Sequence, residues 1–95
     1  MRAVIAQVFT LTGPGSGPGE VGQKAIAETK AAEGCEDFIL LVDQTKGEGL
    51  AVVLWRDEAA MNAVAARREE LRRDVQGETP ELQVSEPRIY DVWSS

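Results

Sequence analysis

The chain has 95 residues and a formal net charge of −6, with 16 acidic and 10 basic side chains and no histidine. A chain of this length is typical of one small domain with a thin core, so we expect a single domain over residues 1–95. The acidic balance argues against a nucleic-acid or anionic-membrane surface, because affinity for phosphate depends on clustered lysine and arginine. We therefore expect neither nucleic acid nor a membrane as a partner.

Cys35 is the single cysteine. An internal disulfide cannot form, which favours a reducing, cytoplasmic location. Without histidine or a second thiol the chain also lacks the usual ligands of zinc and iron–sulfur clusters, and we expect no metal and no cofactor. No segment approaches the roughly 18 consecutive apolar residues of a membrane helix.

The N-terminal third predicts a strand, a loop and a helix. Residues 3–12 are rich in Val, Ile, Phe and Thr and run into a Gly/Pro cluster at 13–19, which indicates a strand followed by a loop. In residues 20–33 small and apolar side chains recur at spacings of three and four, so a helix follows. Gly34 supplies its left-handed stop, while Gly22 weakens its start.

Two apolar runs in the middle of the chain predict a hairpin. Residues 38–42 and 50–55 are continuously apolar, and the stretch between them, 43–49, is polar with two glycines. Neither run alternates between apolar and polar residues. Each strand is therefore expected to be covered on both faces.

The remaining residues predict a second helix and a last strand. Asp57 is a helix cap, and the helix after it carries one apolar face before Gly77 ends it; that face consists of Met61, Val64, Leu71 and Val75. Residues 82–93 are again rich in strand-forming side chains, but Pro87 interrupts them, which suits an edge strand with a bend.

This order of elements, βαββαβ, predicts an α+β ferredoxin-like fold with a four-stranded antiparallel sheet and two helices on one face. The other face of the sheet is then bare, although the hairpin strands are apolar on both sides. A homodimer that packs sheet on sheet is the simplest covering. A monomer whose hairpin is merely rich in Val and Leu remains the alternative.

With this order in place, the stretch from Gly34-Cys35-Glu36-Asp37-Phe38 to Leu54-Trp55-Arg56-Asp57-Glu58-Ala59-Ala60-Met61 resembles the antibiotic-biosynthesis-monooxygenase family of dimeric α/β-barrel proteins. That family commonly has a similar start to its second strand, a Trp that ends the third strand, and a Glu-Ala segment before the second helix. The resemblance implies a homodimer whose two sheets form a barrel, with a pocket in each subunit between sheet and helices. Members include cofactor-independent oxygenases of aromatic polyketides and haem-degrading enzymes.

The haem-degrading members use an Asn on the first strand, a Trp at the end of the third strand and a His on the second helix. By this resemblance Trp55 matches the Trp, and Gln7 takes the place of the Asn with the same amide chemistry. Ala65 stands where the His is expected, and the chain has no histidine at all. An axial imidazole for haem iron is missing, so haem degradation is disfavoured.

Four residues are candidates for a site. Gln7 interrupts an apolar strand, and its amide needs partners, which are either protein groups or a ligand. Trp55 can stack on a planar substrate or simply pack; these two are the catalytic candidates. Arg68 lies at the edge of the apolar face of the second helix and either pairs with a carboxylate or anchors an acidic or phenolate ligand. Tyr90 is the second candidate ligand-binding residue, unless it points outward from the rim.

Two functions remain open. The first is a homodimer that binds a planar, polyketide-like aromatic molecule and oxygenates it without a cofactor. Such chemistry needs an ionisable substrate and a polar group for the oxyanion, and no carboxylate interrupts the predicted apolar strands to act as the base. The second is a non-catalytic dimerisation or ligand-sensing module with the same fold.

Overall fold

The computed structural model describes residues 3–13 and 19–94. Most of the Gly/Pro-rich loop predicted from the sequence, residues 14–18, lies outside this part of the chain. The elements in chain order are β1 (Ile5–Thr12), α1 (Glu20–Lys30), β2 (Cys35–Asp43), β3 (Glu48–Trp55), α2 (Glu58–Ala63), α3 (Ala65–Glu78), β4 (Gln83–Val84) and β5 (Arg88–Asp91).

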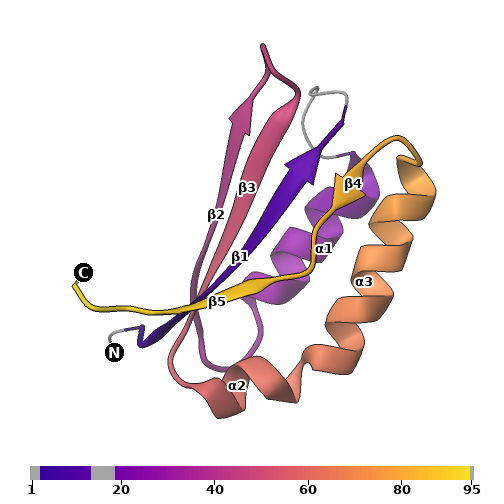
Figure 1. The fold of residues 1–95 in the computed structure, drawn as a ribbon. Coiled ribbons are helices and arrows are strands. Elements are labelled where there is room, and N and C mark those ends of the chain that lie inside the picture. Colours follow the sequence, from indigo (N-terminus) through magenta and orange to yellow (C-terminus); the bar gives the residue numbers. More distant parts are fainter. Residues whose placement is uncertain (1–2, 14–18, 95) are drawn as a thin grey trace.

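The strands form one antiparallel sheet in the order β2-β3-β1-β4, and β5 pairs with the same edge of β1 as β4 does, further along. The two short strands are thus the interrupted edge strand that the sequence predicts. Figure 1 shows α1 and α3 on the same side of this sheet, with α2 at one end of it. The predicted α+β ferredoxin-like fold is confirmed.

Local sequence explains the connection from α1 to β2. Gly34 follows the helix with φ +86°, a left-handed conformation that glycine adopts without strain. A Cβ at this position would also collide with the side chain of Ala60. The helix itself ends earlier than predicted, at Lys30, with Ala31 as its C-cap. Gly34 instead turns the chain into β2 and lets α2 approach the start of that strand.

The second predicted helix is wrong in one respect, because the structure divides it into α2 and α3. Val64 has φ −105° and ψ 9° between the two helices, and the chain changes direction there (Figure 1). The residues around Val64 include no glycine or proline, so local propensity does not cause the break. The bend keeps Met61 in the core at the end of the sheet, while α3 runs along the sheet with Leu71 and Val75 facing it.

The register of the sheet assigns each side chain to one of two faces. Ile5 pairs with Trp55 and Gln7 with Val53, and these side chains share the face toward the helices. The core lies there and consists of Ile5, Val53, Trp55, Ala60 and Met61. The opposite face carries exposed apolar side chains at Val4, Ile39, Leu41, Leu50 and Tyr90.

One extra residue separates β4 from β5. Val84 pairs with Leu11, whereas Arg88 pairs with Val8, so four residues on one strand match three on the other. The hydroxyl of Ser85 accepts a hydrogen bond of 2.9 Å from the Thr10 backbone amide. This gives the amide a partner at the point where the backbone hydrogen bonds between the strands are interrupted. An added residue reverses the face of every side chain that follows it.

None of the described helices is long and apolar enough to cross a membrane.

Candidate functional site

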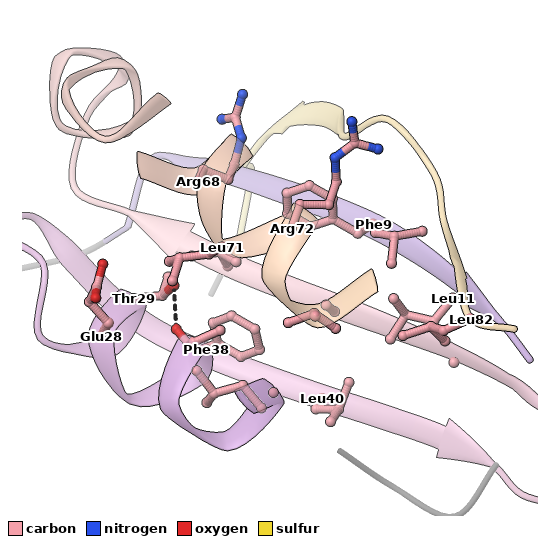
Figure 2. A pocket seen from close by; sticks show the side chains of 18 of the residues that line it. Phe9, Leu11, Glu28, Thr29, Phe38, Leu40, Arg68, Leu71, Arg72 and Leu82 are labelled. Carbon is pink, nitrogen blue, oxygen red and sulfur yellow. Dashed lines mark hydrogen bonds between the residues drawn. The ribbon is translucent and has the colours of Figure 1, made fainter. Parts of the chain in front are cut away.

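A cavity of about 520 Å³ lies between the sheet and the helices α1 and α3. Most of the side chains that line it are apolar, and they come from all the layers around it: Phe9, Leu11, Phe38, Leu40, Leu71 and Leu82 (Figure 2). Such a lining excludes water and favours an apolar ligand. The few polar groups inside therefore decide which ligand is bound and how it is oriented.

Gln7 is the buried polar side chain of this cavity, with 1% of its surface exposed. Its Oε1 accepts a hydrogen bond of 3.2 Å from the Nε1 of Trp55, which is equally buried. The two residues are diagonal neighbours across β1 and β3, because Gln7 pairs with Val53, two positions before Trp55. Side chains in that relation share a face and come within reach of each other.

The indole of Trp55 fixes the orientation of the Gln7 amide. An indole Nε1–H can donate a hydrogen bond but cannot accept one, so the amide must turn its oxygen toward Trp55. The other end, the Nε2 amino group, is fully buried and has no hydrogen-bond partner among the described residues. Gln7 is one of the residues that line the cavity, and this donor of its side chain is left unpaired.

Trp55 both packs and lines the cavity. Its side chain belongs to the core with Ile5 and Met61, and its backbone carbonyl accepts a hydrogen bond of 2.9 Å from the Val4 amide. The two uses that the sequence left open, packing and a place at a pocket, therefore coincide in one residue. The hydrogen bond to Gln7 adds a third, because it orients the amide.

Arg68 lies on α3 and lines the cavity, half-buried. Its Nε is buried and has no hydrogen-bond partner among the described residues, and none of the ion pairs found there includes Arg68. Its neighbour one turn on, Arg72, is paired with Glu69 at 3.0 Å. Figure 2 shows both guanidinium groups leaving α3 in the same direction. Arg68 thus adds a second unpaired donor to the lining.

Three carboxylates line the cavity, and all belong to exposed residues: Glu28, Glu48 and Glu78. Glu28 accepts two hydrogen bonds from Arg67, at 2.6 and 2.8 Å, which joins α1 to α3. These bonds lower the pKa of the Glu28 carboxyl from its ordinary value. A carboxylate with a lowered pKa is a poor proton acceptor, so Glu28 is better suited to holding the helices together than to acid–base chemistry.

Tyr90 is not among the residues that line this cavity, and it has the outward position that the sequence left open as the alternative. It pairs with Ala6 on β5, so its side chain lies on the face of the sheet away from the helices, and 48% of its surface is exposed. The extra residue between β4 and β5 is the cause. Val84, before it, lines the cavity; in a regular strand without the bulge, Tyr90 would lie six positions further on and share its face.

Sequence analysis identified a helix face of small and apolar residues, but not that this face makes room for a cavity. Gly22, Ala25, Ile26 and Thr29 follow one another at helical spacings along the face of α1 that lines it. Gly22 was interpreted only as a weakness of the helix start, but it is buried at the cavity wall. The Thr29 hydroxyl donates a hydrogen bond of 2.8 Å to the carbonyl of Ala25, so its proton is already bound within the helix. Small side chains on a helix that faces a sheet were the available signal.

The described residues contain no group of three or more Cys, Asp or Glu side chains placed to hold a metal ion.

Comparison with known proteins places the fold. No family model matches the sequence, and no curated protein matches it. Solved structures do match over nearly the whole chain. A protein of unknown function from Bacteroides thetaiotaomicron, described as a possible oxidoreductase, superposes with a TM-score of 0.70 at 11% identity, covering 97% of this chain and 100% of its own.

Two further structures are similar. One is described as a candidate antibiotic biosynthesis monooxygenase from Deinococcus radiodurans, with a TM-score of 0.58, 15% identity and coverage of 96% and 92% of the two chains. The other is a protein from Mycobacterium tuberculosis, with a TM-score of 0.61, 18% identity and coverage of 96% and 97%. The chain therefore has the fold of the antibiotic-biosynthesis-monooxygenase proteins, as its sequence indicates.

Proposed function

We propose that this protein is a homodimer in which each subunit binds a planar, largely apolar small molecule in the cavity between sheet and helices. The unpaired Nε2 of Gln7 is the observation that carries the proposal. A buried donor without a partner costs about 1–3 kcal/mol, and a ligand oxygen recovers that cost. The cavity volume of about 520 Å³ also falls within the range of about 300–1,000 Å³ that is usual for ligand sites.

The open face of the sheet supports the homodimer. Its exposed apolar side chains come from several strands, and α1 and α3 lie on the other side (Figure 1). A contiguous apolar surface of this kind marks an association site in most proteins. A second copy offers an identical apolar surface, so a two-fold contact covers both at once.

The reaction that we propose for the bound molecule is oxygenation without a cofactor, by analogy with the described monooxygenase of the same fold. An anthrone-type substrate loses a proton from its ring CH₂ group and becomes an electron-rich enolate. The enolate gives its electrons to O₂; one oxygen atom becomes a ring carbonyl, and the other leaves as water with the two hydrogens of the CH₂ group. The amide of Gln7 donates a hydrogen bond to the enolate oxygen, and the apolar lining keeps water away from the intermediate.

Non-catalytic ligand sensing is the second candidate, and the carboxylates favour it. The three at the cavity lie on exposed residues, and Glu28 is already bound to Arg67. None of the described lining residues is a buried carboxylate suited to remove the substrate proton. In an oxygenase of this design the substrate must therefore ionise with help from the Gln7 hydrogen bond and solvent alone.

Oxygen uptake with an anthrone separates the two candidates. The wild-type protein, Gln7→Ala and Trp55→Phe are compared with Lys46→Ala, a control in the exposed hairpin turn, and binding is followed by equilibrium dialysis. Uptake above the uncatalysed rate that falls in both cavity variants, but not in the control, supports the oxygenase. Binding without uptake supports ligand sensing. If the protein shows neither binding nor oxygen uptake, the proposed site is wrong for this class of molecule.

A further inference from the structure

The hydrogen bond between Trp55 and Gln7 does more than join two strands, because it gives the cavity a polarity: the Gln7 amide has its donor end free and its acceptor end occupied. The indole donates to the amide oxygen at 3.2 Å, so the amide cannot turn over without losing that bond. A turned amide would set its Nε2–H against the indole N–H, and two donors do not pair. The Nε2 group is consequently held as a donor that the described protein groups leave unused.

We infer that this end of the cavity selects ligands by a hydrogen-bond acceptor, namely the carbonyl or enolate oxygen of a planar ring compound. The inference deepens the proposed function and rests on it. The second unpaired group in the lining, the Nε of Arg68, is also a donor. A ligand that brings a methylene or an amino group to Gln7 leaves the donor unsatisfied, whereas a carbonyl oxygen pairs with it.

Trp55 is in this view a positioning residue. It acts on the ligand through the amide of Gln7, in addition to any contact of its ring with the cavity. Its phenylalanine variant keeps an aromatic ring in the core but removes the N–H. The amide of Gln7 is then free to present either its oxygen or its nitrogen to the ligand, and the preference for an acceptor weakens.

A matched pair of ligands tests the inference. 9-Fluorenone and fluorene have the same three-ring outline and differ by a carbonyl in place of a methylene. Their dissociation constants are measured by equilibrium dialysis for wild type, Gln7→Met and Trp55→Phe, with circular dichroism to confirm folding. The quantity compared is the ratio of the fluorene constant to the fluorenone constant, because the different hydration of the two ligands cancels between variants.

We expect this ratio to fall about tenfold from wild type to Gln7→Met, the equivalent of about one hydrogen bond. In Trp55→Phe the ratio should fall by a smaller factor. A purely structural role of Trp55 would weaken both ligands equally and leave the ratio unchanged, which would overturn the positioning role. An equal ratio in wild type and Gln7→Met, with both ligands bound, overturns the selectivity while the binding site stands. If wild type binds neither ligand, the proposed function fails and the inference with it.

Discussion

The pair of Gln7 and Trp55 makes a prediction about stability that differs from the usual effect of breaking a hydrogen bond. In the ligand-free protein one donor of the pair, Nε2 of Gln7, is buried and unpaired among the described residues. Gln7→Met removes this unpaired donor but leaves the Trp55 N–H without its acceptor. Trp55→Phe leaves both ends of the Gln7 amide unpaired. The double variant Gln7→Met with Trp55→Phe has no buried polar group left at this place.

Counting unpaired groups gives the size of the effect. Each costs about 1–3 kcal/mol, and the number is one in wild type, one in Gln7→Met, two in Trp55→Phe and none in the double variant. The free energy of unfolding should therefore change little in Gln7→Met and fall clearly in Trp55→Phe, which also loses packing. The double variant should recover stability relative to Trp55→Phe. The coupling between the two substitutions is about 2 kcal/mol at the lower end of the cost per group, in the stabilising direction.

Urea unfolding of the four proteins, followed by circular dichroism, measures this coupling at one protein concentration, because dimerisation would otherwise shift the midpoints. A variant of Met61, such as Met61→Leu, is a suitable control for core packing beside Trp55. If the two single changes add to within about 0.5 kcal/mol, the hydrogen bond between Trp55 and Gln7 contributes nothing and the polarity assigned to the cavity is wrong. A clear loss of stability in Gln7→Met alone would show that Nε2 is satisfied in the wild-type protein.

Three further outcomes are expected. Leu41→Glu on the open face should turn the dimer into a monomer in sedimentation velocity, whereas Ala66→Glu on the exposed surface of α3 should not; a monomeric wild type would refute the dimer. Glu28→Gln should speed ligand release at neutral pH, since Glu28 and Arg67 line both the cavity and an outer groove and the substitution weakens the charged hydrogen bonds that join them. The pKa of Glu28 is lowered, so this difference should persist above pH 4.5 and vanish as the pH falls further. Equal release rates at neutral pH would show that the Glu28–Arg67 pair does not control release. Asp57→Ala should lower the melting temperature at neutral pH, because the Asp57 carboxylate accepts a hydrogen bond from the backbone amide of residue 60 at the start of α2. That bond is the main cause of the lowered pKa of Asp57, so the difference in melting temperature between wild type and variant should disappear below pH 3.8. A difference that stays constant with pH would count against the capping role.

Much of the fold could be predicted from the sequence because its signals are local. The continuous apolar runs of β2 and β3 predict the hairpin, and Gly34 predicts a turn with a positive φ before β2, although the helix already ends at Lys30. The break at Val64 could not be predicted, since it arises from how α2 meets the end of the sheet. Nothing in the neighbouring residues disfavours a continuous helix.

The candidate site was predictable only in part. Gln7 is conspicuous as an amide in an apolar strand, and Trp55 as an aromatic residue at a strand end; the structure brings them into contact. Which end of the amide is free depends on the partner of its oxygen, and that requires the register of β1 against β3. The space itself depends on small residues of α1, such as Gly22 and Ala25, whose signal in the sequence is their size and not a reactive group.

Tyr90 shows why residue parity fails as a guide beyond a bend. Counted along a regular strand from Val84, Tyr90 would face the cavity, because the two positions differ by an even number. The additional residue between β4 and β5 reverses that parity, and the Ser85 hydroxyl keeps the Thr10 amide paired at the interruption. The bulge therefore places Tyr90 on the apolar open face. The buried side-chain atoms of the described cavity lining that lack a hydrogen-bond partner are then Nε2 of Gln7 and Nε of Arg68. One extra residue in an edge strand thus decides on which face of the sheet Tyr90 lies.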